Sequence, residues 1–266
     1  MCLIALAWKS HPRYRLAMIA NRDEVHSRPS APAGPDPERP DVYGGRDLVL
    51  GGSWLLASSR GRLAAVTNVR VGSNPPVAAR SRGDLVRDFI TSDADSAQWL
   101  ASLEATAQDY GRFNLLAWDG VDLMFASNHP QFTRYPVAPG LHAMSNGAFD
   151  APWPKSAHAT GALSDWMKSP PVVSPSDGHV ALIAPLLDAL ADTTRAPDTA
   201  LPDTGVGLEW ERTLSPPFVL GDHYGTRCST VVLVDQDSIS FAERRYGPQA
   251  QVLGESVATL PITMAK

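Results

Sequence analysis

Apolar residues occur along the chain in short blocks that predict paired strands. The stretch from Cys2 to Trp8 is continuously apolar and too short for a helix, which is typical of a strand buried on both faces. A second apolar block follows the turn SHPR, so we expect ranges 2–9 and 13–22 to form a hairpin. The same reasoning predicts three more hairpins, with strands at 48–58 and 62–70, 113–120 and 121–127, and 225–235 and 238–246.

Helical periodicity is found in four segments. Ser81 has the position of an N-cap residue before an amphipathic helix that ends near residue 90, and a second helix is expected near 94–108. Two more helices are expected at 152–168 and 177–192. Strands and helices do not alternate regularly, which disfavours a Rossmann or barrel arrangement. We predict an α+β fold in which helices cover two stacked antiparallel sheets, in one domain spanning residues 1–266.

Residues 28–40 form a proline-rich segment, with prolines at positions 29, 32, 35, 37 and 40. Proline lacks a backbone N–H and fixes φ, so this composition excludes a helix or a central strand. We expect an extended surface loop here, and loops of this length are often lids or mobile segments. Residues 192–217 are also expected to form loops.

Composition narrows the classes of function. The net charge of −5 and the absence of a Lys/Arg block disfavour nucleic-acid binding. Cys2 and Cys228 are too few for a disulfide framework, and no apolar run reaches the roughly 18 residues of a membrane span. The seven histidines are scattered outside any zinc-binding motif, so no metal site is predicted. We therefore expect a soluble, cytoplasmic protein with no nucleic-acid partner and no membrane span.

Cys2 follows the initiator methionine, and this position changes its chemistry. A small side chain at position 2 favours removal of Met1, which leaves a thiol and a free α-amine on one residue. Unperturbed, these groups have pKa values of about 8.5 and about 8, so the amine can act as general base for the thiol. The alternative is that a small apolar cysteine fills the start of a buried strand.

The second apolar block changes abruptly into Asn21, Arg22, Asp23 and Glu24. In a hairpin with strands of similar length, these four residues lie beside Cys2. A carboxylate there can hold an α-ammonium group, and an arginine can lower the pKa of a thiol or bind a substrate carboxylate. The alternative is an ordinary strand end with solvated charges.

The opening MCLIALAW, followed by ANRDE, resembles the NRDE family, also called the transport-and-Golgi-organisation family. The resemblance continues through GGRDLVLGGSWLLAS (44–58), AARSRGDLVRDFI (78–90), MSNGAFDAPWPK (144–155) and YGTRCSTVVLVD (224–235). Two positions depart from the family pattern, because Ser53 replaces a threonine and Cys228 replaces a serine. The family is similar to N-terminal nucleophile hydrolases, so the resemblance implies a four-layer αββα sandwich with antiparallel sheets.

The resemblance also implies roles for single residues. In the cysteine branch of these hydrolases, which includes penicillin V and bile-salt acylases, the mature chain starts with the nucleophile. An Arg-x-x-Asp arrangement follows at the end of the second strand. Cys2 matches the nucleophile and Asp23 matches the aspartate. The arginine of the Arg-x-x-Asp arrangement has no counterpart in this chain, because Ala20 occupies its position and Arg22 lies two positions further along.

Later motifs supply more candidates. The Asn146 amide can donate a hydrogen bond to a developing oxyanion, and Gly147 allows the backbone to approach closely. The alternative is an ordinary turn, because Asn-Gly is a common turn dipeptide. Trp54 is either a pocket residue or a tryptophan of the core. Arg227 is either a pocket residue or a surface arginine. Arginines at 80, 82 and 87 can bind phosphate at a helix start or simply face water. The residues expected to bind substrate are Asn21, Arg22, Glu24, Trp54, Gly147 and Arg227.

Two hypotheses for function follow. In the first, the chain is an N-terminal cysteine hydrolase or acyltransferase that acts on an amide or thioester of a small amphipathic substrate, without a cofactor. Cys2 attacks, Asp23 orients its amine and Asn146 stabilises the oxyanion. The second, implied by the resemblance, is a non-catalytic carrier or chaperone for haem, lipid or acyl-CoA. His223, Tyr224 and Cys2 are then the candidate haem ligands, and the chain has no haem-attachment motif.

Overall fold

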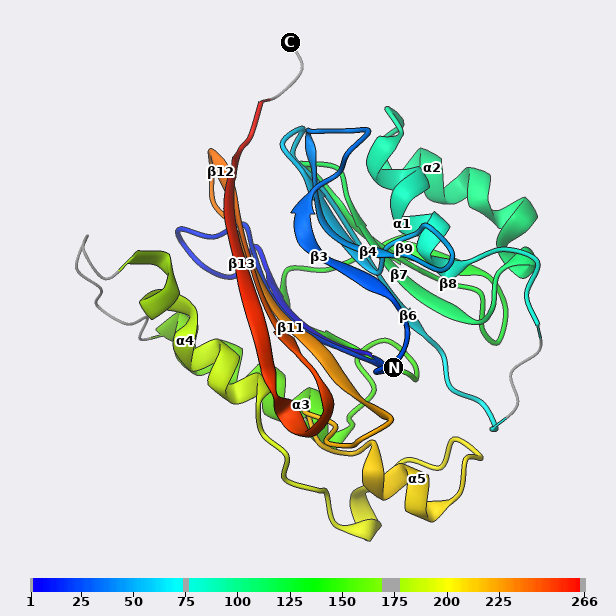
Figure 1. Ribbon diagram of the computed structural model, residues 1–266. Coiled ribbons are helices and arrows are strands. Elements are labelled where there is room, and N and C mark those ends of the chain that lie inside the picture. The colour runs from blue at the N-terminus through cyan, green and yellow to red at the C-terminus, as the bar shows by residue number, and fades with distance from the viewer. Residues whose placement is uncertain (1, 74–76, 169–177, 264–266) are drawn as a thin grey trace.

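The computed structural model describes residues 2–73, 77–168 and 178–263. Its strands form two antiparallel sheets (Figure 1). The six-stranded sheet has the order β10-β1-β2-β11-β12-β13, with bounds Gly140–Met144, Cys2–Trp8, Leu16–Val25, Tyr224–Val234, Ser238–Tyr246 and Val252–Pro261. The seven-stranded sheet has the order β3-β4-β5-β6-β7-β8-β9, with bounds Ser30–Pro35, Val42–Asp47, Leu55–Ser58, Arg62–Asn68, Phe113–Trp118, Leu123–Ser127 and Thr133–Pro136.

Helices cover the outer face of each sheet (Figure 1). The pair α1 (Arg82–Thr91) and α2 (Ser96–Leu103) packs on the seven-stranded sheet. The pair α3 (Pro154–Lys168) and α4 (Gly178–Leu190) packs on the six-stranded sheet. Buried residues accordingly form three clusters, one between the sheets and one under each helix pair. The layer order is αββα, so the predicted fold class is confirmed.

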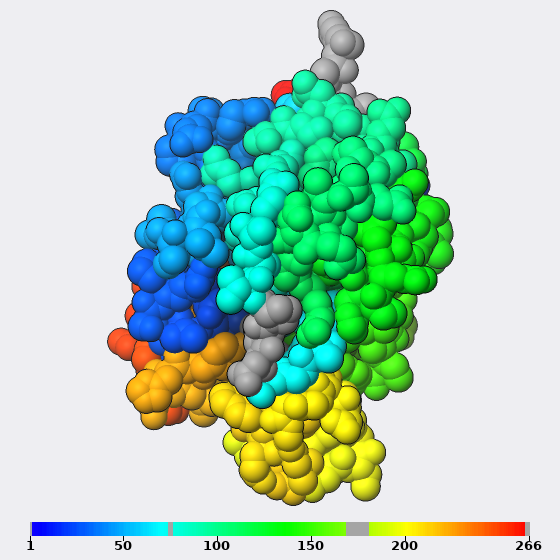
Figure 2. All heavy atoms as spheres, turned by 90° about the vertical axis from the view of Figure 1, so that its right-hand side faces the viewer, coloured from blue at the N-terminus to red at the C-terminus, as the bar shows by residue number. Residues whose placement is uncertain are grey.

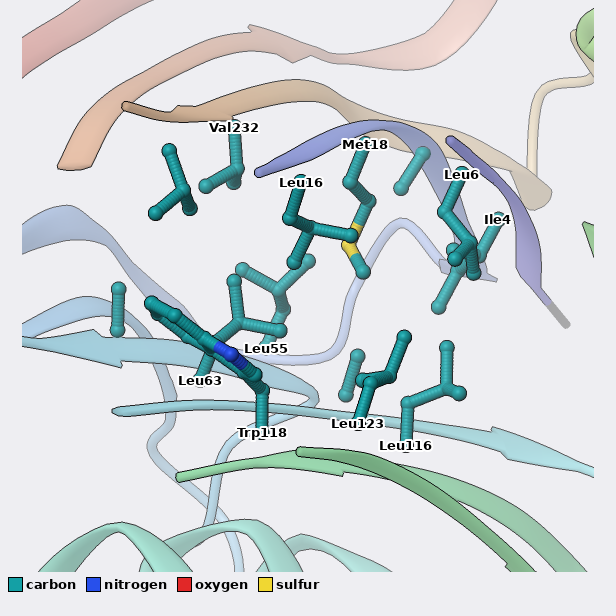
Figure 3. Close-up of a cluster of buried hydrophobic side chains, with 14 of the residues drawn as sticks. Ile4, Leu6, Leu16, Met18, Leu55, Leu63, Leu116, Trp118, Leu123 and Val232 are labelled. Atoms are coloured by element: carbon teal, nitrogen blue, oxygen red, sulfur yellow. The ribbon is translucent and has the colours of Figure 1, made fainter. Parts of the chain in front are cut away.

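The pleat of β2 explains why its apolar run is continuous. Leu16, Met18 and Ala20 point into the space between the sheets, whereas Ala17 and Ile19 face the helices. Figure 3 shows Leu16 and Met18 across from large side chains of the other sheet, including Leu55, Leu63, Leu116, Trp118 and Leu123. A central strand between two packed layers must be apolar on both faces. Each large side chain buried in this way contributes about 1.5–3 kcal/mol.

The first predicted hairpin is confirmed, but its second strand runs further than expected. Cys2 of β1 lies opposite Arg22 of β2, and β2 continues to Val25. The extension is supported by β11, in which Tyr224 pairs with Val25. Residues 21–24 are therefore part of a strand that pairs with β11 along its whole end, and they still lie beside Cys2 as predicted.

The other predicted elements are present with shifted bounds. Ser81 caps α1 by accepting a hydrogen bond from the Gly83 N–H at 3.2 Å. The helix expected near 94–108 is divided into α2 and a 3₁₀ segment, Glu104–Asp109. Residues 48–50 form a turn and residues 51–54 are irregular, so the strand expected from residue 48 starts at Leu55. The short helix α5 (Leu208–Thr213) lies in a region predicted to be loop.

Part of the proline-rich segment is a strand, which corrects the prediction of a loop. Residues 30–35 form β3, an edge strand, where the missing N–H of proline removes no ladder hydrogen bond. The Ala33 N–H also donates to the Glu243 carboxylate of the other sheet at 2.8 Å. The segment is therefore held by both sheets. None of the helices in the described ranges is long and apolar enough to cross a membrane.

Candidate active site

Residues from both sheets line a cavity of about 1160 Å³ beside the start of β1. Its walls include the side chains of Trp54, Val66 and Leu214, which give it apolar surface. The contributing segments meet on the face shown in Figure 2, where blue N-terminal residues, cyan residues ahead of α1 and yellow residues around α5 approach one another. A cavity of this size accommodates a drug-sized or larger ligand.

A row of four side chains crosses the floor of this cavity. Cys2 lies opposite Arg22, Arg22 opposite Cys228, and Cys228 opposite Arg245, on four neighbouring strands. Directly opposed residues of antiparallel strands share a face of the sheet, and all four line the cavity. Cys2 and Cys228 are two strand spacings apart, roughly 10 Å, which is too far for a disulfide. Both are free thiols.

Cys2 is held at the cavity with its thiol in the protonated form. Only 8% of the residue is exposed, and its backbone oxygen accepts a hydrogen bond from Ser145 Oγ at 2.9 Å. Burial raises the pKa of the Cys2 thiol, and Asp23 raises it further, whereas Arg22 acts in the opposite direction. The thiolate is the nucleophile in cysteine chemistry, so Cys2 needs a base in order to react.

Asp23 is buried and lines the same cavity. Its Oδ1 accepts a hydrogen bond from Thr226 Oγ1 at 2.7 Å, and its backbone oxygen accepts one from the Tyr224 hydroxyl at 3.3 Å. Burial raises the pKa of Tyr224 well above its usual value, so Tyr224 remains a neutral hydrogen-bond donor. These contacts fix the carboxylate next to the start of β1.

The structure places Asn146 differently from the prediction. Its side-chain amide donates to Asn68, at 3.0 Å to the backbone oxygen and at 3.0 Å to Oδ1. Asn146 is fully buried and is not among the described residues that line the cavity, whereas Asn68 lines it. Asn68 Nδ2 makes no hydrogen bond to any described residue. Asn68 is therefore the amide donor that faces the cavity, and Asn146 fixes its orientation.

Two further predicted substrate-binding residues point elsewhere. Asn21 lies on the helix side of β2, because neighbouring residues of a strand face opposite sides. Its amide donates to the backbone oxygens of Leu190 and Pro217, at 2.8 Å each. Gly147 makes room for Trp153, since a Cβ there would lie 2.6 Å from the indole ring. Neither Asn21 nor Gly147 is among the described residues that line the cavity.

The remaining predicted residues do line the cavity. Arg22 and Glu24 form an ion pair at 3.7 Å. Trp54 is partly buried against the core between the sheets. Arg227 donates to the backbone oxygens of Val25 and Arg28, at 2.9 and 3.1 Å. Arg227 therefore fastens the chain ahead of β3 as well as contributing positive charge.

The sequence as a whole places the chain among known proteins. The family model described as Transport and Golgi organisation 2 matches residues 1–248. The chain belongs to this family. The family predicted from the motifs is thus confirmed. Two relatives named Transport and Golgi organization protein 2 homolog, from Bos taurus and Homo sapiens, are 35% and 33% identical, and each match covers 92% of both chains.

Two solved structures are similar to this member of the family. One is the Caenorhabditis elegans N-acylethanolamine-hydrolyzing acid amidase ortholog, with a TM-score of 0.48, 9% identity, and coverage of 87% of this chain and 92% of that one. The other is the mutant C2A conjugated bile acid hydrolase from Clostridium perfringens, with a TM-score of 0.46, 8% identity, and coverage of 98% and 92%. The αββα layer order is established by the sheets and helices of this chain, without reference to these two structures.

The cavity of this family member is strongly positive, although the whole chain carries a net charge of −5. Among the described residues, nine arginines line it, against four carboxylates, those of Asp23, Glu24, Asp47 and Glu243. The side chain of Arg82, the first residue of α1, makes no hydrogen bond or ion pair with any described residue. Burial lowers its pKa, and Cys2 and Glu24 oppose that effect. A guanidinium group in such a position has the chemistry to bind a carboxylate or phosphate.

Asn68 was not predicted from the sequence as a site residue. The sequence also does not distinguish Arg82 from the neighbouring arginines at 80 and 87. Asn68 ends a predicted strand and carries no motif, so only its contact with Asn146 reveals it. Arg87 is paired with Asp36 at 2.9 Å, outside the cavity. His223, a candidate haem ligand, is not among the described lining residues. The described ranges contain no group of three or more His, Cys, Asp or Glu side chains arranged to hold a metal ion.

Proposed function

We propose that this protein is a cysteine hydrolase or acyltransferase that acts on an amide or thioester of a small, anionic, amphipathic substrate. The observation that carries the proposal is the placement of Cys2, Asp23 and the unused amide of Asn68 around one cavity. A nucleophile, a carboxylate that orients a base, and an oxyanion donor are the groups that acyl transfer requires. Cys2 supplies both nucleophile and base once Met1 is removed.

The reaction then proceeds in two steps. The α-amine of Cys2 takes the thiol proton, and the thiolate attacks the substrate carbonyl carbon. The oxyanion of the tetrahedral intermediate accepts a hydrogen bond from Asn68 Nδ2, which is a contribution of about 3–4 kcal/mol in such sites. The leaving amine or thiol takes the proton from the α-ammonium, and Cys2 retains the acyl group as a thioester. Water or a second acceptor releases it.

The walls of the cavity support the substrate class. Arginines line it in excess over carboxylates, and Trp54, Val66 and Leu214 add apolar surface. An acyl chain joined to a phosphate- or carboxylate-bearing group, as in acyl-CoA or a charged lipid, has the matching chemistry. Arg82 is the first binding group for the charged end, because no described residue occupies its guanidinium.

The same charge also supports a second function, that of a carrier. A positive cavity of about 1160 Å³ can hold acyl-CoA, a lipid or haem without turnover. Tyr224 and Cys2 line the cavity and remain candidate haem ligands in this case. Binding would then persist when the thiol is removed.

Intact mass spectrometry of the purified protein, incubated with an acyl thioester, tests the first function. We expect a chain without Met1 that gains one acyl group, and a peptide map that places the group on Cys2. Cys228→Ala is the matched control, because Cys228 lines the same cavity, and it should be acylated as the wild type is. Cys2→Ala should gain no acyl group. Retained Met1, or acylation of Cys2→Ala, rules out the catalytic proposal, and acyl-CoA binding that persists in Cys2→Ala then supports the carrier.

A further inference from the structure

The mouth of the cavity is bordered by apolar side chains that are open to solvent. Five large apolar residues line the cavity and are also between 40% and 59% exposed: Val25, Leu50, Val71, Trp210 and Leu253. A residue that lines a cavity and is open to solvent lies where the cavity meets the surface. These residues come from five separate segments, namely β2, the turn after β4, the chain after β6, α5 and β13. We call them the apolar rim.

The turn after β4 extends the apolar rim outward. Leu48, Val49 and Leu50 are three consecutive large apolar residues, and each is more than half exposed. A run of this kind is unusual on the surface of a globular protein unless it has a function. Leu48 and Val49 are not among the described residues that line the cavity. Neither the core nor the cavity therefore accounts for these two side chains.

Polar contacts hold this turn in place. The Val49 N–H donates to Asp47 Oδ1 at 2.9 Å, and Asp47 is paired with Arg28 at 2.5 Å. Behind the turn, Gly52 packs closely against the start of α1, since a Cβ there would lie 2.5 Å from the carbonyl carbon of Gly83. The exposed apolar side chains are therefore presented by a turn that is fixed on both sides.

Positive charge lies beside the apolar rim. Arg46 comes two residues before the turn, and its side chain makes no hydrogen bond or ion pair with any described residue. Arg112 donates to the backbone oxygen of Val71, a rim residue, at 3.0 Å. Both arginines line the cavity and are partly exposed. Cations and exposed apolar groups therefore share one face of a chain whose net charge is −5.

We propose that the apolar rim and the turn at residues 48–50 dock on an anionic lipid surface, so that the cavity opens toward the lipid. Apolar side chains that enter the interface and cations that meet anionic head groups together bind a protein at a bilayer surface. Tryptophan, as at position 210, is favoured at this depth because its ring is amphipathic. Since the chain as a whole is negative, the positive mouth also determines which face approaches the lipid.

A lipid surface suits this mouth better than a protein partner does. The rim residues border an opening, so a protein seated on them would close the cavity. A lipid layer instead offers amphipathic anions, which match the arginines and apolar walls of the cavity. Docking itself needs no reaction at Cys2. Only the transfer of a substrate from the lipid to Cys2 rests on the proposed function.

Co-sedimentation of the full chain with lipid vesicles tests the docking. At low salt, vesicles of phosphatidylcholine with about 30% phosphatidylserine should bind the protein at least about tenfold more tightly than phosphatidylcholine alone. Added salt should weaken this binding, because it screens the arginines. Val49→Glu should lower the affinity for the anionic vesicles by about tenfold or more, because it places a negative charge where an apolar side chain enters the interface.

Val121→Glu is the matched control for Val49→Glu. Both valines are exposed, and each N–H donates to Oδ1 of the aspartate two residues earlier, at 2.9 and 3.0 Å. Val121 lies at the far end of the seven-stranded sheet, because Gly120 is beside Gly61 at the start of β6, whereas Asn68 at the end of β6 lines the cavity. Val121→Glu adds the same charge and should bind vesicles as the wild type does.

Three outcomes overturn the docking: no binding of the wild type to anionic vesicles, equal binding by the two glutamate variants, or a wild-type dimer that Val49→Glu dissociates and that ignores vesicles. The last would make this face an interface between two copies of the chain. If Val49→Glu does not fold, Val49→Ser and Val121→Ser repeat the comparison. Retained Met1 with normal vesicle binding removes the catalytic proposal alone, and acylated Cys2 without vesicle binding removes the docking alone.

Discussion

Asn146 donates its side-chain amide to Asn68 twice, at 3.0 Å to the backbone oxygen and at 3.0 Å to Oδ1. The amide of Asn68 is thereby fixed with its oxygen toward Asn146, and its Nδ2 makes no hydrogen bond to another described residue. One asparagine is buried and the other lines the cavity beside Cys2. Asn146 therefore supports Asn68, and Asn68 Nδ2 is the oxyanion donor of the proposed reaction.

This division predicts different outcomes for the two asparagines. Asn68→Ala should lower kcat by roughly 10²–10³-fold, because it removes an oxyanion donor, and should lower the free energy of unfolding by only about 0.5–1.5 kcal/mol, because Asn146 keeps its hydrogen bond to the backbone oxygen of residue 68. Asn146→Ala should also lower the free energy of unfolding by about 1–3 kcal/mol, because it leaves buried polar groups unpaired. Turnover of an acyl thioester and urea unfolding measure the two effects. Normal turnover in Asn68→Ala would show that the donor is elsewhere.

Arg82 should determine the affinity for anionic ligands. Arg82→Ala should weaken the binding of an acyl-CoA by roughly 10–100-fold, because a hydrogen bond to a charged group contributes about 1.5–3 kcal/mol. Arg87→Ala is the control on the same helix, since Arg87 is paired with Asp36 outside the cavity, and it should bind as the wild type does. Isothermal titration calorimetry measures the Kd for acyl-CoA in each variant. An equal loss of affinity in Arg82→Ala and Arg87→Ala would contradict a specific role for Arg82.

The buried ion pair between Arg70 and Glu211 should be sensitive to the loss of one partner. Their side chains are 6% and 4% exposed and lie 2.6 Å apart. Glu211→Gln leaves the Arg70 charge buried and should lower the free energy of unfolding by about 3–5 kcal/mol. Glu209→Gln, at an exposed ion pair with Arg212 on the same helix, should change it by less than about 1 kcal/mol. Similar effects of the two variants on urea unfolding would show that burial of the pair is unimportant.

Lys155 of α3 is buried, and burial lowers its pKa to about 8, which predicts a pH dependence of stability. The unfolded chain keeps Lys155 protonated up to about 10.5, whereas the folded chain releases this proton from about 8. Between these values the unfolded state binds more protons, so the Lys155 contribution to stability rises with pH. The free energy of unfolding of the wild type minus that of Lys155→Met should therefore increase by about 3 kcal/mol across this range. Urea unfolding of both proteins at several pH values checks the sign, and a flat difference would contradict it.

Much of the layered fold was predictable from sequence because its signals are local. The apolar blocks of β1, β2, β7 and β8 and the Ser81 cap depend on near neighbours in the chain. β3 and β13 are edge strands, and their sequences lack continuous apolar runs because most of their side chains are exposed or only partly buried. Their existence depends on pairing with β4 and β12, which local patterns do not encode.

The sequence by itself determined the family, the hairpin that brings Asp23 to Cys2, and the αββα class. Only the tertiary structure decided which side chains reach the cavity. Asn21 and Arg22 are neighbours in sequence, yet the pleat turns one toward the helices and the other toward the cavity. Asn68 and Asn146 are 78 positions apart and become one unit through hydrogen bonds between the end of β6 and the segment that follows β10. Such contacts arise when the layers pack together, because burial forces each polar group to find its partner across the chain.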